Sequence, residues 1–270
     1  MDLSQYLEFA VQTAYDAGRL TLGYFQTGVR PECKDDDTPV TVADREAENL
    51  MRDRIRSKYP KHTIIGEEYG TEEGALGTHR WILDPIDGTR SFVRGVPLYG
   101  VLIGLEIEGS CEVGVAYFPA IDEMVYAATG RGCYLNGRRV RVADTKTLGN
   151  SYVAFTDSKS FGEHGREEAW RRVQGTVLYS PGWSDAYGHA LVATGRLEIM
   201  LDPVMNPWDC GPFPPILREA GGYFGDWFGK ETIYGGEALS TTRTLLPGVL
   251  GLLGDQTPPS DEQQENTPTV

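Results

Sequence analysis

Positive charge and cysteine are both scarce in this sequence, and each shortage excludes a group of functions. The 270 residues carry 25 Lys and Arg against 39 Asp and Glu, a formal net charge of −14 at pH 7. Binding to nucleic acid or to an anionic membrane needs a basic surface, so this balance argues against both kinds of partner. The 4 cysteines form no Cys-x-x-Cys pair, which favours idle or buried thiols in a reducing compartment over disulfides or a zinc site.

Long apolar runs and several well-known motifs are also missing. No run reaches the roughly 18 apolar residues of a membrane span, and the start, Met1 to Gln5, lacks the basic and then apolar pattern of a signal peptide. We therefore expect a cytoplasmic protein. A GxxxxGK[ST] phosphate loop, an HExxH zinc motif and a GxSxG nucleophile elbow are absent, which argues against those three chemistries.

The apolar patterns that are present predict a mixed α/β chain. Apolar residues recur at three- and four-residue steps over 3–25 and 43–58, which predicts two amphipathic helices. Between 63 and 142 short apolar or alternating runs predict strands, with a hairpin turn at Asn136-Gly137. The other expected elements are strands at 81–83, 99–107, 113–118, 124–128, 133–135, 140–142, 151–155 and 197–201, and helices at 184–194 and 209–220.

The length fits one domain, which we expect to span 1–254 in two abutting subdomains. The break between the subdomains is expected near 145–150, which gives about 1–147 and 148–254. Residues 255–270 are polar and contain almost no large apolar residue, so they cannot bury enough surface to offset chain entropy. We predict that they form a disordered tail.

Carboxylates are the most informative candidates for chemistry. Asp84 and Asp87 follow the apolar run Trp81 to Leu83, with Pro85 between them and Gly88 directly after. Strand ends are where open α/β sheets build sites, and two carboxylates with an intervening carbonyl suit a hard divalent cation such as Mg²⁺. The alternative is an ordinary Asx turn that caps the next element.

Three further acidic segments favour the cation site over the Asx turn. The run Ile64-Ile65-Gly66 ends in Glu67 and Glu68, Asp209 opens an expected helix, and Asp44 follows Thr41. Each has a plainer interpretation, because a helix-start acid is often an N-cap and one of two adjacent glutamates is often only solvated.

Together these segments resemble the inositol monophosphatase superfamily of metal-dependent phosphatases, in order and spacing, from about residue 5 to 250. The motifs that carry the resemblance are Gly66-Glu67-Glu68, Asp84-Pro85-Ile86-Asp87-Gly88-Thr89, Pro207-Trp208-Asp209 and Glu219-Ala220-Gly221-Gly222, with lesser matches at Lys34, Thr41 to Asp44 and Gly130 to Gly137. The resemblance implies an α/β fold, the layered α/β/α/β/α sandwich of the inositol monophosphatase and fructose-1,6-bisphosphatase type. It also implies a homodimer.

The same resemblance implies roles for individual residues. Glu67, Asp84 and the carbonyl of Ile86 would hold one Mg²⁺, Asp84 would bridge to a second held by Asp87 and Asp209, and Asp44 would support a third through water. Glu67 and Thr89 would orient the attacking water. The expected substrate contacts are Asp87, the backbone N–H groups of Gly88 and Thr89, and the side chains of Arg90, Asp185 and Asp202.

Within the superfamily, Arg90-Ser91-Phe92 and Ser184 to Gly188 resemble the histidinol-phosphate phosphatase branch, which implies a place in histidine biosynthesis. An Asp185 carboxylate suits the cationic histidinol phosphate better than a polyol. Surface pairing or helix capping remains the alternative for Asp185 and Asp202, and a solvated charge for Arg90. Two features depart from the family pattern: no arginine lies just ahead of Asp185, and the prolines after Asp209 predict a late or irregular helix start.

We therefore expect a Mg²⁺-dependent phosphatase acting on L-histidinol phosphate. The alternatives are an inositol-1-phosphate or broad sugar-phosphate phosphatase of the same family and, from a different class, a catalytically silent metal- or phosphate-binding protein.

Overall fold

The structure is a computed structural model that describes residues 2–33, 39–183 and 185–254. Lys34, Ser184 and the tail predicted over 255–270 lie outside these ranges. The helices are α1 (Ser4–Leu22), α2 (Val42–Lys58), α3 (Thr89–Val93), α4 (Ser158–Glu163), α5 (Glu167–Gln174), α6 (Asp185–Ala193), α7 (Pro207–Cys210), α8 (Phe213–Ala220) and α9 (Leu246–Leu253), with a 3-10 turn at Leu148–Asn150.

Within the described residues, the strands form three sheets. They are β1 (Glu32–Cys33), β2 (Pro39–Val40), β3 (Thr63–Gly66), β4 (Gly70–Glu72), β5 (His79–Asp87), β6 (Gly100–Ile107), β7 (Ser110–Phe118), β8 (Glu123–Ala128), β9 (Gly132–Leu135), β10 (Arg138–Arg139), β11 (Val153–Ala154), β12 (Ile199–Asp202), β13 (Gly222–Gly225) and β14 (Ala238–Thr242).

The large sheet has the strand order β10-β9-β8-β7-β6-β5-β3-β4 and is antiparallel except between β3 and β5. The smaller sheet has the order β11-β12-β14-β13, with only β11 and β12 parallel. β1 and β2 form a separate two-stranded ribbon.

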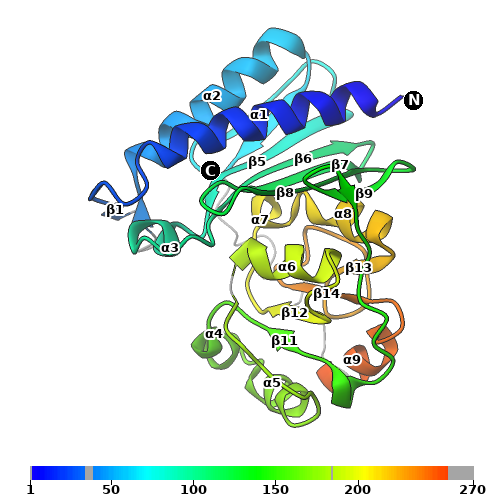
Figure 1. Cartoon of the computed structure of the whole chain (residues 1–270). Helices are drawn as coiled ribbons and strands as arrows, with labels where there is room; N and C mark the ends of the chain where they lie inside the picture. The colour runs from blue at the N-terminus through cyan, green and yellow to red at the C-terminus, as the bar shows by residue number, and fades with distance from the viewer. Residues whose placement is uncertain (1, 34–38, 184, 255–270) are drawn as a thin grey trace.

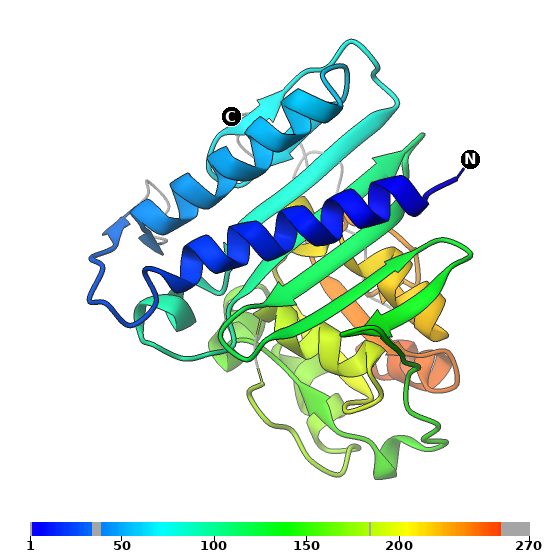
Figure 2. The same cartoon turned by 45° about the horizontal axis from the view of Figure 1, so that its top comes forward.

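Helices and sheets alternate in five layers (Figures 1 and 2). α1 and α2 lie side by side over one face of the large sheet, and α6, α7 and α8 lie between the two sheets. α4, α5 and α9 cover the far face of the small sheet through a cluster that includes Phe161, Trp170 and Val249. The predicted α/β/α/β/α sandwich is confirmed.

The individual elements follow the predicted patterns with one correction. The helix predicted over 209–220 has the irregular start that its prolines indicated, because it is interrupted between α7 and α8. Proline has no N–H to donate, and Pro214 and Pro215 occupy the first turn of α8, the only turn where this costs no helical bond. The hairpin at Asn136-Gly137 is confirmed by positive φ angles of 47° and 81°, but its second strand is Arg138–Arg139 rather than 140–142.

The end of β5 carries a feature that the sequence did not reveal. The register of β5 against β6 shifts between Asp84, which faces Leu102, and Asp87, which faces Gly100. Three steps along β5 therefore match two along β6, which defines a β-bulge at Pro85 and Ile86. The two acids lie within the end of the strand rather than after it, and the bulge redirects their side chains.

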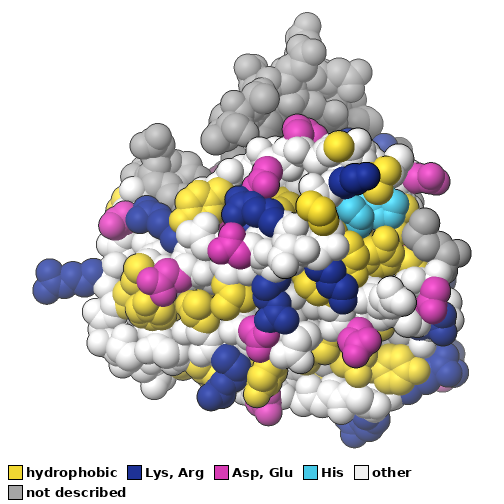
Figure 3. All heavy atoms as spheres, turned by 90° about the horizontal axis from the view of Figure 1, so that it is seen from above, with side chains coloured by type: hydrophobic (Ala, Val, Ile, Leu, Met, Phe, Trp, Pro, Cys, Tyr) yellow, Lys and Arg dark blue, Asp and Glu magenta, His cyan; other side chains and the backbone are white. Residues whose placement is uncertain are grey.

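Charge is mixed on the face above α1 and α2. Lys and Arg side chains alternate with Asp and Glu side chains there, so the net charge of −14 is not concentrated on this face (Figure 3). No helix in the described part of the chain combines the length and the apolar character that a membrane crossing requires.

Candidate active site

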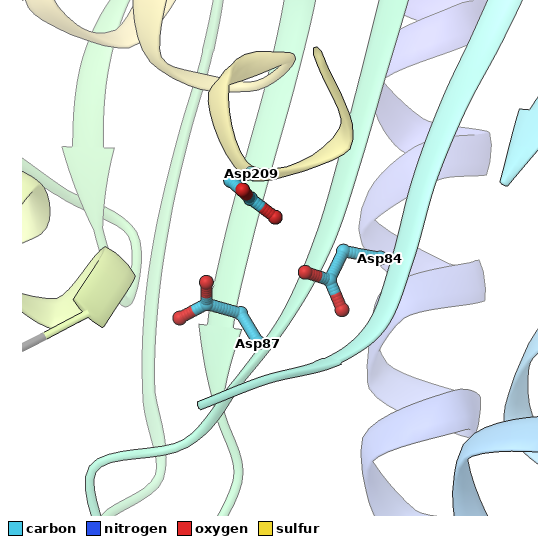
Figure 4. A group of neighbouring side chains, drawn as sticks. All are labelled: Asp84, Asp87 and Asp209. Carbon is cyan, nitrogen blue, oxygen red and sulfur yellow. The ribbon is translucent and has the colours of Figure 1, made fainter. Parts of the chain in front are cut away.

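Three carboxylates from two distant segments meet between the large sheet and the middle helix layer. Asp84 and Asp87 come from the bulged end of β5, and Asp209 comes from α7 (Figure 4). One oxygen from each lies within 4.8 Å of the other two. Carboxylate oxygens are the ligands that Mg²⁺ prefers, so this arrangement fits a divalent cation.

Burial makes this cluster costly without a cation. Asp84 is 1% exposed and Asp87 is 8% exposed. Burial, together with the neighbouring charge of Glu67, raises the pKa of Asp84 well above its usual range. Burial and then the charge of Asp185 do the same to the pKa of Asp87, and burial raises the pKa of Asp209 to about 6 despite hydrogen bonds from Asn206. A bound cation would offset this repulsion, which is the second reason that the residues fit a metal centre.

Glu67 and Asp44, the other predicted metal ligands, lie near the cluster. The charges of both contribute to the raised pKa of Asp84. The Glu67 amide donates to the Leu83 carbonyl at 3.2 Å, which joins the turn after β3 to β5 next to Asp84.

Asp44 links the start of α2 to the predicted catalytic threonine. Its Oδ2 accepts from the amide and the hydroxyl of Thr41, at 2.8 and 2.6 Å, and completes a capping box. The hydroxyl of Thr89 lies 3.3 Å from Oδ1 of Asp44 and 3.1 Å from the carbonyl of Ile86. Thr41 is therefore the N-cap of α2, and Asp44 is the third residue of the helix, which completes the cap and also contacts Thr89 at the site.

Gly88 is the N-cap of α3 and has the left-handed conformation, with φ at 77°. A Cβ at this position would lie 2.8 Å from Oδ2 of Asp185, so glycine is required both by the backbone and by the approach of Asp185. Arg90, the second residue of α3, is exposed.

Asp185 is tied to this region through backbone and side chain. Its φ is 54°, an unusual value for a residue other than glycine, and its amide donates to the Thr156 hydroxyl at 3.0 Å. Ser91 donates to Oδ2 of Asp185 at 3.3 Å. The next amide, of Ala186, donates to Oδ2 of Asp87 at 2.8 Å. The start of α6 thus lies against both the acidic cluster and the loop at Gly88.

Asp202 is buried at the end of β12. It is 2% exposed, and its oxygens contact the amide of Thr156 at 3.3 Å and Nε2 of His189 at 3.2 Å. Nδ1 of His189 lies 2.7 Å from the hydroxyl of Ser240. Substrate contact by Asp202 stays a prediction; in this geometry its carboxylate supports Thr156, which in turn holds the amide of Asp185.

Sequence reasoning missed two charged residues beside the site. Glu48 and Arg52 are 0% and 2% exposed, and their side chains pair at 2.7 Å. The signal was present, because opposite charges four residues apart fall in phase with the buried stripe of Ala47, Met51 and Ile55.

Comparison with known proteins identifies the family of the chain. The model of the inositol monophosphatase family matches residues 2–253. A histidinol-phosphatase from Chlorobaculum parvum is 44% identical over 241 residues, which cover 89% of this chain and 93% of that protein. The Nus factor SuhB of Escherichia coli is 33% identical over 228 residues, 83% of this chain and 85% of that protein. The structure of an inositol monophosphatase from Anabaena matches with a TM-score of 0.84 at 28% identity, covering 97% of this chain and all of the other.

The fold, the acidic cluster and these relatives define a hydrolase that acts on phosphate monoesters. The chain belongs to the inositol monophosphatase family.

Proposed function

We propose that the protein is a Mg²⁺-dependent phosphatase that converts L-histidinol phosphate to L-histidinol and phosphate. The observation that carries the choice of substrate is the position of Asp185 beside Gly88. A carboxylate here would face the organic part of a phosphate ester whose phosphoryl group lies at the start of α3. The relative named histidinol-phosphatase, at 44% identity, supports the same choice.

The metal ligands in this proposal are Glu67, Asp84 and the Ile86 carbonyl for one ion, and Asp84, Asp87 and Asp209 for a second. Asp44 would support a third ion through water. When bound, Mg²⁺ supplies charge neutralisation at the phosphoryl oxygens and a water of lowered pKa.

The protein groups hold the two reactants in place. The N–H groups of Gly88 and Thr89 bind phosphoryl oxygens, with Asp87 and Arg90 as further contacts. Glu67 and Thr89 orient the attacking water, and the contact of Thr89 with Asp44 restricts the direction of its hydroxyl. Because water is the nucleophile, no covalent enzyme intermediate is required.

Asp185 provides the discrimination between substrates. Histidinol phosphate carries an ammonium group and an imidazole, and a carboxylate forms a charge-assisted hydrogen bond with the ammonium group or with the protonated imidazole. A neutral polyol phosphate offers no such partner. Asp202 acts on the same subsite, by substrate contact or through Thr156.

The test is a panel of histidinol phosphate, inositol-1-phosphate and fructose-1,6-bisphosphate with Mg²⁺, with and without a chelator. We expect the highest kcat/KM on histidinol phosphate and complete loss of activity with the chelator. A protein that ignores histidinol phosphate but cleaves inositol-1-phosphate would establish the alternative substrate class instead.

A further inference from the structure

The turn that carries Glu67 lies against a buried ion pair formed by Glu48 and Arg52. Glu48 and Arg52 lie one helical turn apart on α2, and Nε of Arg52 donates to Oε1 of Glu48 at 2.7 Å. Both side chains are almost entirely buried, at 0% and 2% exposure. A buried pair of this kind gains little net stability over apolar residues of the same volume, so its presence calls for another explanation.

Glu48 binds the backbone immediately after Glu67. Its Oε2 accepts from the amide of Glu68 at 2.8 Å, and its Oε1 accepts from the amide of Tyr69 at 3.3 Å. These two N–H groups stand in the turn between β3 and β4, where the Glu48 carboxylate accepts from both. One carboxylate therefore fixes the direction in which the chain leaves Glu67.

Arg52 extends the same support by one residue. Its Nη2 donates to the carbonyl of Gly70 at 2.5 Å, and Nη1 lies 3.5 Å from Glu72 at the end of β4. The guanidinium thus holds Glu48 with one edge and the start of β4 with another.

The residue before Glu67 is fitted to the pair as well. A Cβ on Gly66 would overlap the carboxylate of Glu48 and would lie 2.9 Å from Nη2 of Arg52. Gly66 therefore lets the chain pass directly over the buried pair.

We propose that Glu48 and Arg52 are positioning residues that hold Glu67 in its working geometry. This inference deepens the proposed function and rests on the role given there to Glu67 as metal ligand and water-orienting group. The pair touches the residues on both sides of Glu67, namely Gly66, Glu68, Tyr69 and Gly70. Its loss would therefore let the carboxylate of Glu67 move relative to Asp84 without removing any ligand.

The test compares Glu48→Gln, Arg52→Met and Arg52→Lys with the control Arg54→Met. Arg54 lies on the same helix and pairs with Asp16 on α1, so its replacement removes an ion pair of α2 that does not touch the turn. Three quantities are measured for each variant. Hydrogen exchange at the amides of Glu68 and Tyr69 is measured on the metal-free protein, and Mg²⁺ affinity is measured by calorimetry. The kinetic constants kcat and KM are measured with the phosphate monoester that the wild type cleaves best.

We expect exchange at Glu68 and Tyr69 to accelerate at least about tenfold in Glu48→Gln and Arg52→Met, because the amides lose a buried acceptor or its support. Mg²⁺ affinity should weaken by about tenfold. At saturating Mg²⁺, kcat should fall roughly 10- to 100-fold while KM changes less than about twofold, since misplaced reacting groups reduce turnover more than substrate binding. Arg52→Lys should recover part of each loss, and Arg54→Met should match the wild type in all three.

Folded variants whose exchange, Mg²⁺ affinity and kcat stay within about twofold of wild type would overturn the inference. Should Arg52→Met fail to fold, Arg52→Lys provides the same comparison with the buried charge retained. The exchange measurement uses neither metal nor substrate. A wild type that binds no Mg²⁺ or ignores histidinol phosphate would therefore contradict the proposed function and leave the exchange result standing.

Discussion

The amide of Ala186 donates a 2.8 Å hydrogen bond to Oδ2 of Asp87. One end of this bond belongs to the acidic cluster on β5, and the other belongs to the residue next to Asp185 on α6. Asp87, a proposed metal ligand, therefore helps to set the position of Asp185, whose carboxylate is proposed to contact the substrate. In the proposed function, metal binding and substrate choice would therefore depend on one hydrogen-bonded unit that spans the large sheet and the middle helix layer.

The first prediction concerns Asp84. Asp84→Asn keeps the shape of the side chain but removes the charge shared by the two proposed ions. We expect kcat to fall by roughly 10²-fold or more, the scale for the loss of a principal electrostatic group. Because the variant also removes a buried repulsive charge, the metal-free protein should unfold at a Tm equal to or above that of wild type. Near-normal turnover in the folded variant would contradict the metal assignment.

The second prediction concerns the hydroxyl of Thr89. Thr89→Ala should leave Mg²⁺ affinity nearly unchanged while kcat drops, because the hydroxyl, which contacts Asp44, is proposed to orient water and not to bind the metal. Calorimetry and steady-state kinetics on the same preparation separate the two effects. Thr89→Ser, which keeps the hydroxyl, is the matched control and should retain most of the activity. A collapse of Mg²⁺ affinity with unchanged kcat would make Thr89 a structural residue.

The third prediction concerns pH and metal removal. Burial raises the pKa of Asp209 to about 6 in the folded protein, from an ordinary value of 3.8. A group whose pKa is higher in the folded state stabilises that state at low pH, and the contribution is lost as the pH rises through about 6. Since Mg²⁺ binds the ionised carboxylate, it should restore the lost stability above that pH.

The rise in Tm on adding Mg²⁺ should therefore be larger at pH 7.5 than at pH 5. Thermal unfolding with a chelator or with excess Mg²⁺ measures this difference. In Asp209→Asn the pH dependence of the Mg²⁺ effect should shrink. An equal Mg²⁺ effect at both pH values in the wild type would argue against a cation held by these carboxylates.

Much of the fold could be predicted from periodicity. The apolar stripes predicted α1 and α2 to within a few residues, and alternating runs located β5 to β8, because burial on one face leaves a regular trace in the sequence. The short helices α4, α5 and α9 and the strands β13 and β14 were not predicted. These elements are short, and long-range packing rather than local pattern decides their conformation.

The candidate site, like the fold, could be predicted only in part. Asp84, Asp87 and Asp209 could be found from motif resemblance, and the structure brings them together. The bulge at Pro85 and the hydrogen bond from Ala186 to Asp87 could not be predicted, because both depend on how distant segments pair in the folded chain. The pair of Glu48 with Arg52 left a trace in the spacing of α2, but its contacts with the turn after β3 did not.

The choice of substrate by Asp185 is the central claim, and Asp185→Asn tests it most directly. The measurement is the ratio of kcat/KM on histidinol phosphate to kcat/KM on inositol-1-phosphate, in the wild type and the variant. A charge-assisted hydrogen bond contributes about 1.5–3 kcal/mol, roughly 10- to 150-fold in kcat/KM. Asp144→Asn, which removes a carboxylate 92% exposed and paired only with Lys146 in the described structure, is the control. The account predicts that the ratio falls at least about tenfold in Asp185→Asn and stays constant in the control. An equal loss on both substrates in Asp185→Asn would contradict it.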